Sequence, residues 1–155
     1  MKLLRIITII CVGFLLSGQS SEDGDLDSAF TRDTLVISAD KYACYFFNIY
    51  VASSREQQMR GLMHVRSLPE FTGMIFVYRQ PGIRSMWMKN TYIPLDMVFI
   101  RGDGTVSSVA TDTVPLTLDS VSAIEPVNFV LELNAGVTGK LGIGKESRII
   151  FTNLE

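Results

Sequence analysis

Seven side chains beside apolar segments of the chain could together bind a ligand. Six of them are charged or form hydrogen bonds, and the seventh is a tryptophan. A flat tryptophan ring with guanidinium, ammonium, amide and carboxyl groups around it is what a mostly apolar pocket needs to hold and orient a ligand. The pattern therefore predicts non-catalytic binding of a small polar ligand, a carbohydrate or a cell-envelope component. The candidate ligand-binding residues are Arg60, Trp87, Lys89, Asn90, Thr91, Asp96 and Glu132.

Thioether donors suggest a second possibility, a site for a soft metal ion. Methionine sulfur and imidazole nitrogen suit Cu(I) in an oxidising compartment, and Trp87 could cover such an ion by a cation–π contact. Methionine is also a common filler of protein cores, so we predict no bound metal and no cofactor. The donors that this alternative would use are Met63, Met74, Met86, Met88 and His64.

A third possibility is a hydrolase in which Asp96 and Glu132 act as an acid–base pair, as in enzymes that cleave glycosides. The sequence has no nucleophile elbow, no phosphate-binding loop and no HExxH zinc motif. A Ser–His–Asp triad would have to use His64, the single histidine. We therefore predict no catalytic residue.

The same residues also fit a purely structural role. Strand alternation places Met86 and Met88 on one face and Trp87 on the other, so burial alone explains part of the pattern. Asn90 and Thr91 suit a turn, and Asp96 could accept hydrogen bonds from backbone N–H groups.

The elements that would position these residues are mainly strands. Segments 34–38 and 42–52 are rich in β-branched and aromatic residues, and Asp40-Lys41 between them suits a hairpin. Ser53 followed by Glu56 resembles a capping box, and Gly61 limits the helix predicted over about residues 54–63.

Strand signals return six times after this helix, and Asp103-Gly104 marks a two-residue hairpin. The segment 134–144 is predicted to hold one helical turn. This spacing predicts one mainly β domain, an antiparallel sandwich or barrel-like fold with one or two short helices. The six strands are predicted at residues 73–78, 84–89, 96–101, 105–110, 127–133 and 148–152.

The first 20 residues have the pattern of a secretory signal peptide. Lys2 and Arg5 precede an apolar run at residues 6–16 and a small-residue segment. Gln19 stands where a lipoprotein would carry its lipidated cysteine. We therefore expect a secreted or periplasmic protein that is not a lipoprotein, with membrane attachment only if this segment stays uncleaved.

Residues 21–33 are acidic and without periodicity, which predicts a flexible tether before a domain at residues 34–155. Cleavage of the signal would leave Cys44 as the sole cysteine, which we expect to be a small buried residue. The net charge of -2 over 155 residues gives no electrostatic basis for binding nucleic acid. Oligomeric state is not predicted.

Four motifs occur in a fixed order along the chain, and together they resemble the DUF192 family of domains of unknown function. They are "RGLM" at residues 60–63, "GMIFVY" at 73–78, "WMKNTYIPLDMVFI" at 87–100 and "LELNAG" at 131–136. The resemblance covers about residues 44–151. It implies a compact β-sandwich-like domain with little helix, and it implies no established reaction.

Overall fold

The structure, a computed structural model, describes residues 26–39 and 43–152. The predicted signal segment, the first part of the predicted tether and the turn at Asp40-Lys41 lie outside the described residues. The described elements are, in order, α1 (Leu26–Ala29), β1 (Thr31–Ser38), β2 (Cys44–Ala52), α2 (Arg55–Arg60), β3 (Thr72–Gly82), β4 (Ser85–Met86), β5 (Leu95–Ile100), β6 (Val106–Ala110), β7 (Val121–Ser122), β8 (Val127–Asn134), α3 (Val137–Leu141) and β9 (Arg148–Phe151).

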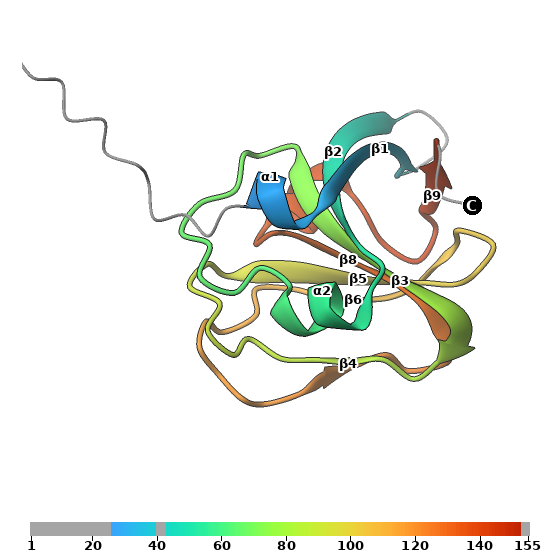
Figure 1. Ribbon diagram of the computed structural model, residues 1–155. Coiled ribbons are helices and arrows are strands. Elements are labelled where there is room, and N and C mark those ends of the chain that lie inside the picture. The colour runs from blue at the N-terminus through green and yellow to red at the C-terminus, as the bar shows by residue number, and fades with distance from the viewer. Residues whose placement is uncertain (1–25, 40–42, 153–155) are drawn as a thin grey trace, which may run out of the picture.

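One curled sheet of seven strands forms a half-barrel, in the order β6-β5-β8-β3-β2-β1-β9, and β4 pairs with β7 in a small second sheet (Figure 1). The mainly β, barrel-like fold with short helices is therefore confirmed. The main sheet is not wholly antiparallel, because β2 and β3 run parallel. A parallel pair needs a crossover, and the segment containing α2 provides it.

The domain begins before the predicted boundary at residue 34. Phe30 is buried, and Leu26 and Ala29 pack against the same core. Asp27 accepts hydrogen bonds from Arg32 and from the Tyr50 hydroxyl, the latter at 3.0 Å. The predicted tether is therefore wrong for residues 26–33, where apolar contacts and the hydrogen bond between Tyr50 and Asp27 tie the chain to β2.

Local boundaries differ from prediction where sequence signals were ambiguous. The capping box at α2 uses Ser54 and Gln57, one residue later than predicted, and Gly61 ends the helix as predicted. Only Ser85–Met86 of the predicted strand at 84–89 pairs with another strand. The predicted alternation still holds, because Met86 and Met88 are buried while Trp87 is 49% exposed.

Cys44 is exposed, so the prediction of a buried cysteine is wrong. It lies at the start of β2, opposite Ser38, where the strand has left the core.

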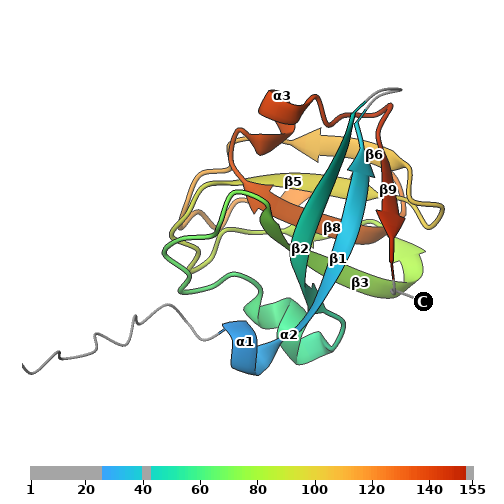
Figure 2. The ribbon, with the colours of Figure 1, turned by 90° about the horizontal axis from the view of Figure 1, so that it is seen from above.

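Both faces of the main sheet carry a hydrophobic core, because successive residues of each strand point to opposite faces. Met97 and Phe99 of β5 belong to one core, and Val98 and Ile100 belong to the other. Leu62, Met86 and Ala123 cover the first core, which we name the α2-side core. Val137 and Ile143 cover the second, the α3-side core. Figure 2 shows α1 and α2 at one end of the β1–β2 pair and α3 at the other.

The two ends of the main sheet also approach each other. Beside the pairing of β9 with β1, Ile149 N–H donates to the Gly104 carbonyl at 2.8 Å, and Val106 N–H donates to the Ser147 carbonyl at 3.2 Å. Gly104 belongs to the predicted Asp103-Gly104 turn between β5 and β6 and has φ of 84°. These contacts join the turn to β9 and nearly close the half-barrel.

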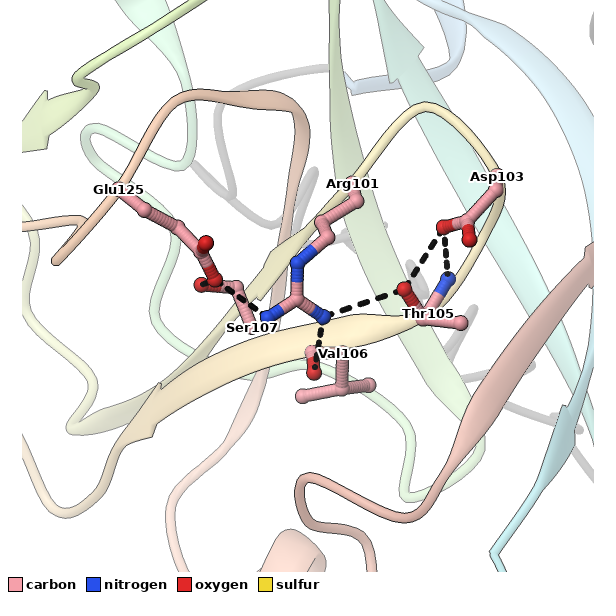
Figure 3. Close-up of polar contacts among 6 residues, drawn as sticks. All are labelled: Arg101, Asp103, Thr105, Val106, Ser107 and Glu125. Atoms are coloured by element: carbon pink, nitrogen blue, oxygen red, sulfur yellow. Dashed lines mark hydrogen bonds and ion pairs between the residues drawn. The ribbon is translucent and has the colours of Figure 1, made fainter.

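A polar cluster around Arg101 fixes the β5–β6 hairpin (Figure 3). The guanidinium donates to the Thr105 hydroxyl at 3.1 Å and to the Val106 carbonyl at 3.0 Å, and it forms an ion pair with Glu125. Hydrogen bonds from Ser107 and then from Arg101 lower the pKa of Glu125. The cluster attaches the segment before β8 to the hairpin.

Gly104→Ala should lower the free energy of unfolding by about 2–4 kcal/mol. A Cβ at this position would overlap the Ile149 carbonyl oxygen, and the positive φ disfavours any other residue. Gly139→Ala in α3 is the matched control, because nothing lies within 4 Å of its added Cβ. Urea unfolding of both variants measures the effect, and equal stabilities would contradict the close approach of the turn to β9.

Candidate functional site

A cleft opens on the α2 side of the main sheet, between α2, β3, β8 and the segment around β4. It has a volume of about 90 Å³, below the roughly 300–1,000 Å³ of pockets that take drug-sized ligands, so it has room for only a few non-hydrogen atoms. Figure 1 shows α2 and β4 on the same side of the sheet. The lining residues are Gln58, Met59, Arg60, Gly61, Leu62, Met63, Phe76, Tyr78, Ser85, Met86, Trp87, Lys89, Thr91 and Glu132.

Burial divides the lining into a base and a rim. Phe76, Met86, Thr91 and Glu132 are buried and form the base. The rim includes exposed or half-buried side chains from α2 and from the segment after β4, among them Trp87. The base of the cleft is therefore largely apolar and carries one carboxyl group, whereas its mouth is polar.

Glu132 is the acidic residue of this lining, and it is only 4% exposed. Its cross-strand neighbours are Met74 on β3 and Met97 on β5, and both are fully buried. Among the described residues, none donates a hydrogen bond to its carboxyl group. Burial raises the pKa of Glu132 from its ordinary value of 4.5 to about 8. The base of the cleft therefore holds a neutral carboxylic acid near pH 7.

Tyr78 also lines the cleft, and its hydroxyl donates to the Met86 sulfur at 3.9 Å. Burial raises the pKa of Tyr78, the Arg84 charge opposes this, and the Glu132 carboxylate adds to it. Arg84 stacks on the Tyr78 ring, with its Cζ 4.0 Å from the ring centroid. Tyr78 is therefore held as a neutral phenol.

The rim carries two cationic side chains held against aromatic rings. The Lys89 Nζ lies 5.3 Å from the Trp87 ring centroid, and the Arg60 Cζ lies 5.4 Å from the Phe30 ring centroid. Cation–π contacts of this length restrain the positions of the two charges. Since Glu132 is neutral near pH 7, the lining carries a net positive charge.

Five of the seven predicted site residues line this cleft, namely Arg60, Trp87, Lys89, Thr91 and Glu132. Asn90 does not line it, although it is a sequence neighbour of two residues that do. Asn90 has φ of 54° and its carbonyl accepts a hydrogen bond from His64 N–H at 2.8 Å. Asn90 therefore shapes the turn, which is the structural role that the sequence predicted for it.

Asp96 lies on the opposite face of the sheet, so its predicted convergence with the other site residues is wrong. One carboxyl oxygen accepts from the Thr138 N–H at 3.0 Å and hydroxyl at 2.6 Å, and the other accepts from Asp112 N–H at 2.9 Å. Asp96 is fully buried and attaches α3 and the segment after β6 to β5. The geometry therefore supports the structural role predicted for Asp96, in which its carboxylate accepts hydrogen bonds from backbone N–H groups.

The predicted acid–base pair of Asp96 and Glu132 is wrong for the same reason. Asp96 pairs with Leu133, and Glu132 pairs with Met97, so the two carboxyl groups point to opposite faces. A hydrolase that uses these two groups together is therefore excluded by the register of β5 and β8.

The donors predicted for Cu(I) are also separated. Met63 and Met86 line the cleft, whereas Met74 and Met88 are fully buried, and the Met88 sulfur accepts a hydrogen bond from Thr113. His64 does not line the cleft, and its ring nitrogen lies 3.3 Å from the Tyr92 hydroxyl. The described residues contain no group of three His, Cys, Asp or Glu that could hold a metal.

Several lining residues were not predicted from the sequence. Gln58 and Met59 share the α2 turn with Arg60, so their proximity follows once the helix is known. Tyr78 had no signal, because its place in the lining depends on how β3 meets the segment around β4, where its hydroxyl contacts Met86. No helix within residues 26–39 and 43–152 is long and apolar enough to cross a bilayer.

Fold and cleft define a class of small β half-barrels with a small cleft beside one covering helix. Residues 36–151 match the DUF192 family, described as an uncharacterized ACR, and the chain belongs to this family. A comparison with curated proteins found no match.

Two crystal structures are similar to this chain. One, a protein of Sinorhizobium meliloti provisionally described as a transcription regulator, has 33% identity and a TM-score of 0.78 over 81% of this chain and 97% of its own. The other, a protein of unknown function from Novosphingobium aromaticivorans, has 30% identity and a TM-score of 0.73 over 76% of this chain and 84% of its own.

Asp96→Ala should lower the free energy of unfolding by about 3 kcal/mol, because it leaves three donors without their acceptor. Asp119→Ala is the control, since Asp119 is exposed, and it should change stability by less than about 0.5 kcal/mol. Denaturant unfolding compares them. Similar losses in both variants would show that the Asp96 hydrogen bonds contribute nothing.

Glu132→Gln should remove a pH dependence of stability. The folded state holds the Glu132 proton more tightly than the unfolded state, so wild-type stability is greatest below pH 4.5 and falls until about pH 8. The loss relative to the variant is at most about 5 kcal/mol and levels off at higher pH. Unfolding curves across this range measure it, with Glu146→Gln as an exposed control. Parallel pH profiles for wild type and Glu132→Gln would refute the raised pKa.

Proposed function

We propose that this chain is a non-catalytic binding domain that takes one small polar molecule into the cleft beside α2. The observation that carries the proposal is a carboxyl group buried at the base of an open cleft without a hydrogen-bond partner among the described residues. Burying such a group costs free energy that a partner would recover. A ligand that enters the cleft supplies that partner.

The lining supports binding of a molecule with both polar and apolar parts. The Trp87 ring offers an apolar face at the mouth, and Phe76 and Met86 do so at depth. The Lys89 ammonium group offers hydrogen-bond donors, and the Thr91 hydroxyl, which donates to the Lys89 carbonyl at 3.3 Å, offers an acceptor. The volume of about 90 Å³ favours a molecule, or part of a molecule, of only a few non-hydrogen atoms over an extended chain.

The proposed setting is outside the cytoplasm, in a secreted or periplasmic protein, and this part rests on the signal-like segment at residues 1–20. A regulatory role like that described for the Sinorhizobium protein has less support. The longest helix of the described residues has six residues, which is short for a helix that reads a DNA groove, and the net charge is -2.

Trp87 allows a direct test, because it is the single tryptophan of the chain and lines the cleft. Neutral sugars, hydroxy acids, amino acids and amines are titrated into the full chain while tryptophan emission is recorded. We expect at least one class to change the emission at up to about millimolar concentration. A panel without any effect on emission, or on the thermal unfolding midpoint, would contradict a ligand cleft.

Trp87→Ala should weaken binding of the active compound about five- to tenfold, through loss of the aromatic face. Phe46→Ala is the matched control, because Phe46 is 74% exposed on β2 and does not line the cleft. Isothermal titration compares both variants with wild type. Equal losses in the two variants would place the binding elsewhere.

A further inference from the structure

We propose that the outer face of the two-stranded β4–β7 ribbon, residues 83–91 and 116–124, docks on a lipid bilayer surface that carries anionic headgroups. Figure 1 shows β4 at the lower margin of the molecule, below α2 and the main sheet. The strand that contains β4 borders the ligand cleft, but the exposed side chains of the other strand do not line it. The inference therefore does not depend on the binding function proposed above.

Hydrogen bonds at both ends hold the two segments of the β4–β7 ribbon in one register. Beside the pairing of β4 with β7, Ala123 N–H donates to the Arg84 carbonyl at 2.8 Å. At the far end Leu116 N–H donates to the Thr91 carbonyl at 3.1 Å. Both bonds join residues that the register of β4 and β7 places opposite each other. The two segments therefore run antiparallel and side by side.

Alternation gives the β4–β7 ribbon an inner and an outer face. Met86, Met88 and Ala123 point inward and are buried in the α2-side core. The Ser85 and Ser122 hydroxyls lie 2.8 Å apart, so the intervening residues of both strands share the outer face. Large apolar side chains on that face are 49–67% exposed, which is unusual for a surface that is not a docking site. They are Ile83, Trp87, Leu116, Leu118 and Ile124.

Charge on the β4–β7 ribbon suits an anionic surface. The outer face carries Lys89, whose Nζ lies 5.3 Å from the Trp87 ring centroid. Among the described residues of the ribbon, Asp119 is the one acidic residue, and it belongs to the other face. With Thr117 and Val121 it lines a separate recess toward the segment after β6. An apolar face with a lysine and no carboxylate complements anionic lipid, which attracts the cation and buries the apolar side chains.

A second copy of the chain fits this face less well than a bilayer does. In a two-fold dimer through the β4–β7 ribbon, both Lys89 side chains would enter an interface that offers them no carboxylate. At a bilayer, tryptophan favours the boundary between headgroups and acyl chains, and lysine extends to the phosphates. The signal-like segment at residues 1–20 also predicts export, which brings the chain to a membrane surface.

Phosphatidylglycerol vesicles with brominated acyl chains test the inference on the full chain. Bromine quenches tryptophan emission on contact, and Trp87 is the single tryptophan, so quenching reports contact by the ribbon itself. The double variant Leu118→Ser/Ile124→Ser should lower the quenched fraction at a limiting vesicle concentration about tenfold, because two apolar side chains no longer enter the bilayer. Phe46→Ser is the matched control, since Phe46 is 74% exposed on β2, and it should leave quenching unchanged.

The preference for anionic headgroups is tested with phosphatidylcholine vesicles. Wild type should bind phosphatidylglycerol about fivefold more strongly, because Lys89 is attracted to a negative surface. Lys89→Gln should remove this preference. Lys145→Gln, which changes an exposed lysine between α3 and β9, should keep it. Equal binding of the two lipids by wild type would contradict the proposed anionic surface.

Two other outcomes would overturn the inference. One is Trp87 emission that vesicles leave unquenched, or quench equally in wild type and in Leu118→Ser/Ile124→Ser. The other is a dimer, seen by sedimentation without vesicles, that this double variant dissociates, since a second copy would then cover the ribbon. Urea unfolding checks that each variant folds, and Leu116→Ser serves as the test if the double variant does not. Failure of every ligand in the cleft leaves these results unaffected, because Leu118 and Ile124 do not line it.

Discussion

Coverage of the main sheet on both faces is the constraint on which the rest of this structure depends. All six residues of β5 are buried, and Val130, Leu131, Glu132 and Leu133 of β8 are buried beside them. A polar side chain at the centre of such a sheet meets water only where the cover of one face is incomplete. Away from water it needs hydrogen-bond partners inside the protein. Without them its burial costs free energy, which a bound molecule that forms the hydrogen bond would recover.

Asp96 and Glu132 show the two outcomes of this constraint. They lie on neighbouring strands, one register position apart, and their side chains point to opposite faces. The α3-side core supplies three hydrogen bonds to Asp96, so this carboxylate joins elements that are distant in sequence. The α2-side core supplies none to Glu132, and there the cover of α2 and the small sheet leaves a cleft. One carboxyl group joins elements of the fold, and the other lies at the base of the cleft without a hydrogen bond from a described residue.

Much of the fold could be predicted because local patterns agree with tertiary contacts. The Asp103-Gly104 turn, the Gly61 helix stop and the alternation around Trp87 all depend on a few neighbouring residues. The side of the sheet on which Asp96 and Glu132 lie could not be predicted. Both faces are apolar, so strand periodicity does not mark one as outer. The order of residues 26–33 was also missed, because it depends on Phe30 and Asp27 meeting the distant Tyr50.

The pairing of β1 with β9 has a consequence for how the chain reaches this state. Val36 pairs with Ile150, so the first described strand meets the last one across almost the whole described sequence. Contacts with such large separation slow folding, because loop closure must precede the gain from pairing. During synthesis β1 keeps one open edge until β9 emerges. Until β9 is in place, the unfinished domain therefore exposes a strand edge of the kind to which other strands add.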